Sequence, residues 1–277
     1  MTWGATNHVA SIEKLNRVQG SLTVGLIMVE RKHFLTCSPD ETARAVKEKN
    51  LDNYSFLPVL DDQEQVIGLY DAQRWFDAEA PETLIGDDFQ LLSERIVIGA
   101  DASIFDFLLQ AKENPTNLVI SGNRVSGLVS LHDVQQLPVR SALFALITSF
   151  EMAMATAIVR KWEKPSDWIA KLTTGRRDKL AEQISKSRGI DTFVSEIAFT
   201  QFSDKVDLIC KAGFLSGSNT SVRRELDRIR KLRDNLAHAN SYADTKAAAE
   251  QVCEVVEVIY GRKAELLDAI ESMAKRD

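Results

Sequence analysis

A duplication in the first half of the chain, at residues 22–76 and 85–137, is the feature that most constrains the fold. The first copy contains TVGLIM, HFLTC, SPDETARAVKEK, SFLPVLD and VIGLYDAQRWF, and the second contains RIVIGADASIFDFLLQA and TNLVISGNRVSGLVSLHDV. Each copy predicts a short strand, a helix and a hairpin, in that order. Two copies of this unit predict an α+β domain in the first half of the chain.

Local signals at the ends of these elements support the same order. Ser38 and Pro39, with Glu41, predict the cap and the first-turn acid of the first helix. Residues 121–123, Ser-Gly-Asn, predict the tight turn of the second hairpin.

The duplicated unit resembles the CBS domain, in tandem as in a Bateman pair, and this predicts a nucleotide-sensing domain at 1–137. The resemblance is carried by FLPVLD and VIGLY in the first copy and by NLVIS and GLVSLHD in the second. In that family a strand ending G-h-h-[ST]-x-x-D binds an adenine nucleotide or a related adenosyl ligand, with the hydroxyl at phosphate and the aspartate at the ribose hydroxyls. Gly127, Ser130 and Asp133 match this motif, so the resemblance implies an adenosyl ligand there.

The first copy departs from the motif. Gly68 is kept, but Asp71 stands in place of the hydroxyl and Arg74 in place of the ribose aspartate. A carboxylate accepts two hydrogen bonds from vicinal hydroxyls, whereas an arginine only donates. The sequence therefore supports at most one ordinary nucleotide site. A structural alternative is open for Ser130 and Asp133, because the same residues can cap the helix that follows them.

Strand signals vanish after residue 137, and apolar residues recur at spacings of three and four, which predicts an all-helical bundle at 138–277. The first and last helices are apolar or amphipathic over more length than a small bundle needs, so we expect a homodimer that buries part of that surface. The predicted helices are 138–163, 176–187, 191–200, 203–212, 220–239 and 243–275, with Gly175, Gly189, Gly213 and Gly217 in the loops.

Composition places the chain among soluble globular proteins, with 44% hydrophobic and 27% charged residues. The three cysteines stand alone, without a CxxC pair or a nearby histidine, so neither a disulfide framework nor a metal site is expected. No secretion signal is recognisable in MTWGATNHV. The apolar segment 141–159 is interrupted by Glu151, which predicts a buried helix and not a membrane span. We therefore expect a cytoplasmic protein.

Basic charge is concentrated in the second half of the chain. Residues 1–140 hold 12 Lys and Arg against 20 Asp and Glu, whereas residues 141–277 hold 22 against 20. The densest basic stretch, RRELDRIRKLR at 223–233, is expected to attract a polyanion such as RNA. A solvated helix face is the alternative. The residues predicted to bind RNA are Arg223, Arg224, Arg228, Arg230 and Lys231.

The end of this helix, RKLRDNLAHAN at 230–240, brings four polar side chains together. At about 100° per residue, Asp234 and His238 lie on one flank, with Asn235 three positions before the histidine. The long side chain of Arg233 can reach the same flank. The inward stripe of the helix is predicted to be Val222, Leu226, Ile229, Leu232 and Leu236.

Arg233 and His238, with four residues between them, resemble the R-x4-6-H signature of the HEPN family, whose helical bundles include metal-independent ribonucleases. Such cleavage needs a base, an acid and a cation for the phosphorus centre. The second half of the chain has one histidine, so two catalytic histidines require two protomers, and the family is also arranged around a dimer interface. In this hypothesis Arg233 binds phosphate and Asp234 or Asn235 orients the imidazole. A subset of the family continues H-x-Y, whereas Asn240 stands at that place here.

Glu151 is the single charge in its apolar helix, and burying it unpaired would cost several kcal/mol. We expect it to face Arg233 or Arg160 and to support the catalytic site, with a solvent-facing side chain as the alternative. A plain alternative also exists for Arg233 and His238, because helix C-termini favour cations.

The sequence thus predicts an adenosyl-regulated, metal-independent ribonuclease with a toxin-like or stress-response role. The competing hypothesis is a non-enzymatic nucleotide sensor whose helical half dimerises and binds RNA or a protein partner.

Overall fold

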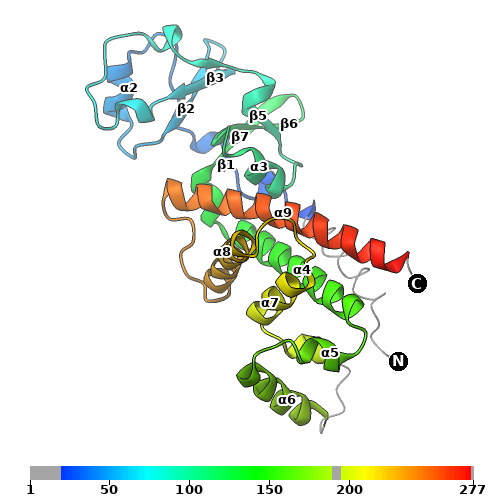
Figure 1. Cartoon of the computed structure of the whole chain (residues 1–277). Coiled ribbons are helices and arrows are strands. Elements are labelled where there is room, and N and C mark those ends of the chain that lie inside the picture. Colours follow the sequence, from blue (N-terminus) through cyan, green and yellow to red (C-terminus); the bar gives the residue numbers. More distant parts are fainter. Residues whose placement is uncertain (1–19, 189–194, 276–277) are drawn as a thin grey trace. The chain divides into compact units, whose positions relative to one another are not determined.

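The computed structural model of the chain describes residues 20–188 and 195–275, and these fall into two compact units (Figure 1). One unit runs from Thr23 to Gln136, and the other contains the chain from Leu137 onward. The first contains all the strands of the described chain, and long helices build the second. The predicted class, an α+β region followed by a helical region, is confirmed. Residues 1–19 of the predicted domain 1–137 lie outside the described residues.

The N-terminal unit contains two sheets, and each copy of the duplicated sequence contributes one helix and one hairpin. The hairpins are β2–β3 and β6–β7, and the helices are α2 and α3. The first sheet has the order β2-β3-β4, with β2 at Phe56–Leu60, β3 at Val66–Asp71 and β4 at Gln90–Leu91. The second has the order β1-β7-β6-β5, with β1 at Val29–Glu30, β5 at Val97–Gly99, β6 at Thr116–Ser121 and β7 at Arg124–Ser130. The helices are α2 at Ala43–Lys49 and α3 at Ile104–Gln110.

The two copies fold as one unit because a strand of the first copy joins the sheet of the second. Glu30 in β1 lies opposite Gly127 in β7. A Cβ atom at Gly127 would stand 2.5 Å from the sulfur of Met28 and 2.9 Å from the carbonyl oxygen of Val29. Gly127 therefore lets β1 approach β7, whatever else the motif does.

A shared apolar cluster joins the two copies as well. Val66 and Leu69 in β3 pack with Leu118 in β6 and Val125 in β7, and all four side chains are buried. Burial of this surface stabilises the pair of copies as a single folding unit.

Some local predictions for the first copy are wrong. Thr42 caps α2, because its hydroxyl accepts a hydrogen bond from the Ala45 N–H at 3.2 Å. The carboxylate of Glu41 instead accepts from the N–H of Ser38 at 2.7 Å, so these residues form a turn before the helix. The predicted strand HFLTC is reduced to one bridge between Cys37 and Val59.

The tight turn of the second hairpin is confirmed. Ser121 pairs with Arg124 across a loop of two residues, and Gly122 has a φ of 63°. This left-handed conformation favours glycine, which has no Cβ.

The helical unit is centred on α4, which packs against α7, α8 and α9. Its helices are α4 at Leu137–Lys161, α5 at Pro165–Ile169, α6 at Thr174–Arg188, α7 at Phe202–Ala212, α8 at Asn219–Ala237 and α9 at Lys246–Ala274. The short α5 was not predicted. The predicted helix 191–200 is wrong over 196–199, where one 3-10 turn forms, while residues 191–194 and Gly189 lie outside the described residues.

Among the described residues, α4 is the one helix long and apolar enough to cross a membrane. The protein itself buries 67% of its most apolar window. Leu143, Leu146 and Phe150 are wholly buried. The apolar composition of α4 is therefore what a helix surrounded by three others requires.

Candidate functional site

The helix α8 presents the polar residues of the candidate site on the side opposite its core contacts. Its buried side chains are those of the predicted stripe: Val222, Leu226, Ile229, Leu232 and Leu236. Arg233, Asp234 and Asn235 are half-buried, and His238 is exposed at the C-cap. The predicted face of the helix is confirmed.

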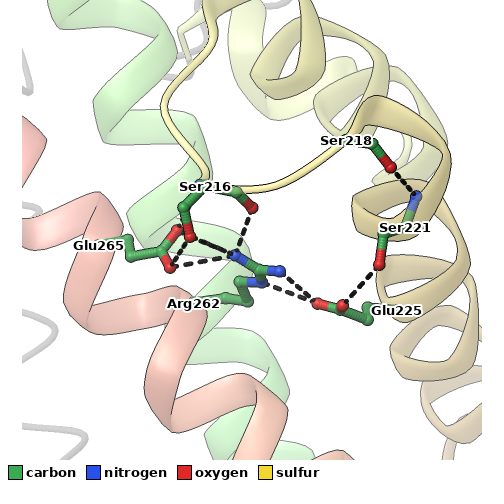
Figure 2. Close-up of polar contacts among 6 residues, drawn as sticks. All are labelled: Ser216, Ser218, Ser221, Glu225, Arg262 and Glu265. Carbon is green, nitrogen blue, oxygen red and sulfur yellow. Dashed lines mark hydrogen bonds and ion pairs between the residues drawn. The ribbon is translucent and has the colours of Figure 1, made fainter.

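Hydrogen bonds and ion pairs hold the first turns of α8 to α9 (Figure 2). Arg262 of α9 is largely buried, and its Nε donates to the carboxylate of Glu225 in α8 at 2.8 Å. Its Nη1 donates to Glu265 at 3.0 Å and to the carbonyl of Ser216 at 2.9 Å. The cap of α8 is Ser218, whose hydroxyl accepts from a backbone N–H at 3.2 Å. The register of α8 against α9 is thereby set.

The last turn of α8 closes in a Schellman motif around His238. The N–H of Asn240 donates to the carbonyl of Asn235 at 3.0 Å, and the N–H of Ala239 donates to that of Leu236 at 3.4 Å. Ala239 has a φ of 54°. This left-handed conformation costs a residue with a Cβ about 1 kcal/mol. The turn that carries His238 is therefore strained at the next residue.

Arg140 of α4 binds this turn from outside the helix. Its guanidinium donates to the carbonyls of Asn235 at 3.3 Å, Leu236 at 3.1 Å and Asn240 at 2.7 Å. It also lies 4.8 Å from the centre of the Tyr242 ring, close enough for a cation–π contact. Burial raises the pKa of Tyr242 to about 12, although the charge of Arg140 acts in the opposite direction.

Sequence reasoning missed Arg140, because 95 to 100 residues separate it from the carbonyls that it binds. No periodicity or motif connects positions so far apart.

Glu151 joins three helices at one carboxylate. Its Oε2 lies 3.6 Å from the Nε of Arg233 in α8, as predicted, and its Oε1 accepts from the Nζ of Lys205 in α7 at 3.0 Å. Lys205, whose side chain is 5% exposed, also donates to the carbonyl of Thr200 at 2.8 Å. Arg160, the other predicted partner, instead donates to the carbonyl of Ile270 at 3.4 Å. The lysine was not predicted.

The carboxylate of Asp234 forms ion pairs with two arginines. It lies 3.0 Å from Arg230 and 3.5 Å from Arg233. The hydrogen bonds formed among residues 20–188 and 195–275 include none from the imidazole of His238 to Asp234 or Asn235. The predicted orienting bond is thus not made within this single chain.

Acidic neighbours compensate most of the basic stretch on α8. Lys231 lies 3.0 Å from Asp227, and Arg224 is exposed and without an ion pair in the described part of the chain. The remaining pairs are Arg223 with Asp207, Arg228 with Glu254, and Arg230 with Asp227. Exposed pairs of this kind are worth roughly 0–1 kcal/mol, so a polyanion can compete for these arginines.

The nucleotide motif forms a capping box at the end of β7. Ser130 caps the 3-10 helix η6 at Leu131–Gln135, and the carboxylate of Asp133 accepts from the Ser130 N–H at 2.7 Å. Its other oxygen accepts from Nε2 of Gln136 at 2.8 Å. Burial raises the pKa of the Asp133 carboxyl, with these hydrogen bonds acting the other way. The structural alternative for Ser130 and Asp133 is therefore realised, and a ligand would have to share or replace these bonds.

The first copy uses the corresponding positions differently. Arg74 lies 2.5 Å from the carboxylate of Asp88, and its Nε is 3.9 Å from Asp71. The carboxylate of Asp71 also accepts from the N–H of Gln73 at 3.2 Å. Arg74, which stands where the second copy has Asp133, is thus held by two carboxylates of its own copy.

Residues 27–74 match the family model of the CBS domain, so the chain contains a CBS domain in its first copy. Solved structures similar to the chain include the CBS domain of a bacterial CNNM/CorC family Mg²⁺ transporter in complex with ATP, at 17% identity and a TM-score of 0.36 over 48% of this chain and 94% of that one. The CBS domains of a transcriptional regulator from Streptococcus pneumoniae align at 17% identity and a TM-score of 0.33, over 40% of this chain and 95% of that one. The CBS-pair protein CBSX2 from Arabidopsis thaliana aligns at 18% identity and a TM-score of 0.34, over 44% of this chain and 94% of that one. A comparison with curated proteins found no match.

A double-mutant cycle tests the buried pair of Glu151 and Lys205. Glu151→Gln should lower the free energy of unfolding by about 3 kcal/mol, because it leaves the Lys205 ammonium buried without its carboxylate. Adding Lys205→Met should restore at least about 1 kcal/mol of this loss, measured by urea unfolding. The control, Glu182→Gln, removes an exposed pair with Lys186 and should cost no more than about 0.5 kcal/mol. If the losses in free energy of unfolding of Glu151→Gln and Lys205→Met simply add in the double variant, the two side chains do not depend on each other and the buried pair is contradicted.

The capping carboxylate predicts a pH dependence. Because burial raises the pKa of Asp133, its ionisation favours the unfolded chain, and the stability that its neutral form contributes is lost as pH rises above about 4. The free energy of unfolding of Asp133→Asn should therefore rise relative to that of the wild type as the pH is raised from 4 to 7. Asp106→Asn, in the capping box of α3 where the carboxylate is exposed, is the control. If the free energy of unfolding of Asp133→Asn instead falls relative to that of the wild type over this range, the raised pKa of Asp133 is contradicted.

Proposed function

We propose that this protein is an adenosyl-ligand-regulated, metal-independent ribonuclease with a HEPN-like helical unit. The observation that carries the proposal is the placement of Arg233 and His238. Glu151 holds the half-exposed guanidinium of Arg233 on α8, and the exposed His238 ends the same helix. One helix end thus presents a fixed cation and one of the two proton-transfer groups that cleavage of an RNA backbone without metal needs.

The chemistry follows from these two groups. A base removes the proton of the 2′-hydroxyl, the resulting oxygen attacks phosphorus, and an acid protonates the departing 5′-oxygen. The imidazole of His238 can act in either step near neutral pH. Arg233 would stabilise the extra negative charge on the phosphoryl oxygens through paired N–H donors. The products are a 2′,3′-cyclic phosphate and a free 5′-hydroxyl.

A complete site requires two copies of the chain in this proposal. One protomer supplies one His238, which cannot be base and acid at once, and the second histidine would come from the partner of a homodimer. RNA would reach the site over the arginines of α8, by exchanging their exposed carboxylate partners for phosphates. The setting would be cytoplasmic, in a toxin-like or stress-response role, with no membrane.

The adenosyl ligand would bind at the second copy of the duplicated unit. Ser130 would face phosphate and Asp133 would accept hydrogen bonds from ribose hydroxyls. The hydrogen bond from Gln136 to Asp133 is the one that a ribose hydroxyl can replace without a loss of donors.

A non-enzymatic nucleotide sensor is the second candidate. Carboxylates pair with the basic residues of α8 and reduce its attraction for RNA, which favours this candidate. The paired residues are Arg223, Arg228, Arg230 and Lys231. In this case the helical unit would dimerise and bind RNA or a protein partner.

Cleavage assays with metal chelated by EDTA test the enzymatic proposal. The wild type should release RNA fragments ending in 2′,3′-cyclic phosphate, and His238→Gln or Arg233→Ala should slow this at least about 100-fold, because each removes a group that acts in the transition state. His33→Gln, at an exposed histidine of the N-terminal unit outside the nucleotide motif, is the matched control and should cleave as the wild type does. If wild type and His238→Gln are equally inert on varied RNAs, with and without ATP or AMP, the sensor hypothesis replaces this one.

Thermal unfolding tests the ligand site. ATP or AMP should raise the melting temperature of the wild type, and Asp133→Asn should weaken the apparent affinity roughly 10-fold or more, because the ribose hydroxyls lose a charged acceptor. Asp106→Asn should respond as the wild type does. A nucleotide-induced rise that survives in both Asp133→Asn and Asp133→Ala would place the ligand elsewhere.

A further inference from the structure

We propose that Trp162, Lys171 and Lys211 form a separate subsite for single-stranded RNA, in which a base stacks on the indole ring and phosphates pair with the two ammonium groups. The inference rests on the proposed function for its ligand, and it adds a binding subsite to the helical unit beside Arg233 and His238. It is carried by the contacts that bring these three side chains together, and we call the three residues the tryptophan corner.

Three segments of the helical unit meet at the tryptophan corner (Figure 1). Trp162 continues the last turn of α4, because its N–H donates to the carbonyl of Ile158 at 3.1 Å. Lys171 follows α5, and its Nζ lies 5.3 Å from the centre of the Trp162 ring. Lys211 lies in the last turn of α7, and its Nζ donates to the carbonyl of Lys171. One aromatic ring is therefore held beside two ammonium groups.

The charge of these two lysines is available to an anion. Both are exposed, and neither ammonium has a carboxylate partner among residues 20–188 and 195–275. Most basic residues of α8, in contrast, are paired with carboxylates. Glu163 and Asp167 lie in the stretch between the ring and the first lysine, and Lys161 and Lys164 offset them in number. The tryptophan corner thus keeps an excess of positive charge.

The contact between Lys171 and the ring can be exchanged for a contact with a base. Trp162 is half-buried, so part of its ring is reached by solvent. A lysine over an exposed ring is held weakly, whereas a nucleic-acid base stacked on an aromatic side chain is held more strongly. A base can therefore displace the Lys171 ammonium from the ring, and the ammonium is then free to pair with a phosphate. Unpaired bases suit this exchange, because the bases of a duplex already stack on one another.

The tryptophan corner adjoins the basic stretch of α8. Asp207 lies one turn before Lys211 on α7, and its carboxylate pairs with Arg223 in the first turns of α8. Arg233 lies about 15 Å further along the same helix, at a rise of about 1.5 Å per residue. A strand stacked on Trp162 can therefore continue over α8 toward the candidate catalytic residues.

Tryptophan fluorescence of the full chain tests the stacking. The probe is an oligouridylate of about 12 nucleotides, which contains no adenosine for the proposed ligand site. EDTA and the His238→Gln background exclude cleavage. The chain has four tryptophans, so the RNA should quench part of the fluorescence, and Trp162→Phe should remove that quenching.

Anisotropy of labelled RNA measures the affinity of the same variants. Trp162→Phe should stay within about threefold of the parent protein, because phenylalanine still offers a face for stacking. Trp162→Leu should bind about 10-fold more weakly, because the stacked base loses its aromatic partner.

The salt dependence of binding tests the lysines. On a single strand, log K falls against log salt concentration with a slope of roughly −0.7 per phosphate contact, so Lys171→Gln combined with Lys211→Gln should make the slope shallower by about 1.4. Trp162→Leu should leave the slope unchanged. The matched control combines Lys112→Gln with Lys186→Gln, which removes two exposed lysines elsewhere, and its slope should change by less than about 0.5. The lysine variants are at exposed positions, so they also cover the case in which Trp162→Leu does not fold.

Four results would overturn the proposal: RNA that quenches no fluorescence at low salt, quenching that Trp162→Phe retains, a folded Trp162→Leu variant that binds as tightly as Trp162→Phe, or a corner-lysine variant whose slope matches that of the control. Inorganic polyphosphate of equal charge should bind more weakly than the RNA, and equal binding would contradict the contact with a base. The ribonuclease proposal fails separately: quenching without cleavage by the wild type contradicts the ribonuclease alone, and cleavage without quenching contradicts the tryptophan corner alone.

Discussion

The buried ammonium of Lys205 is the group on which the arrangement of α4, α7 and α8 depends. A lysine with a 5% exposed side chain is costly unless its donors are satisfied, and here the carboxylate of Glu151 and the carbonyl of Thr200 satisfy them. The second oxygen of Glu151 faces Arg233 on α8. This explains how an apolar helix such as α4 holds a carboxylate, and it ties the candidate phosphate-binding arginine to the core of the helical unit.

Polar contacts at both ends of α8 complete this arrangement. Arg262 holds the first turns to α9, and Arg140 holds the last turn from α4. Apolar packing along the stripe keeps α8 in place but specifies its rotation and register less sharply than directional hydrogen bonds do. The side chains of Arg233 and His238 therefore sit on a helix whose two ends are both fixed by arginines from other helices.

The nucleotide motif shows how one set of donors and acceptors can have two uses. Ser130 and Asp133 form a complete capping box, and the features that suit them to a cap, a hydroxyl and a carboxylate three residues apart, are also those that suit them to a nucleotide. Sequence alone left the two roles open for this reason. Gly127 has a structural role as well, because β1 passes too close for a side chain.

Sequence patterns predicted what depends on neighbours along the chain, and failed where distant residues decide. The five buried positions of α8 and the turn at Gly122 follow from local spacing and from backbone sterics. At HFLTC no strand formed beyond the single bridge of Cys37 to Val59, and the strand that does form, β1, lies a few residues earlier and pairs with β7 of the second copy. The cap of α2 moved from Ser38 to Thr42, since each can initiate a helix and the surrounding turn favours the later start.

What the sequence determined by itself was the helix and hairpin of each repeated copy, the CBS likeness of the duplicated unit, the apolar face of α8 and the need of Glu151 for a cationic partner, with Arg233 as one of two candidates. These follow from periodicity, from repeated motifs and from the cost of burying an unpaired charge. Only the tertiary structure decided that Lys205 shares Glu151, that carboxylates pair the basic residues of α8, and that Arg140 holds the turn of His238. Each of these contacts joins residues from different helices or distant positions, and the geometry that brings them together arises from packing of the whole unit.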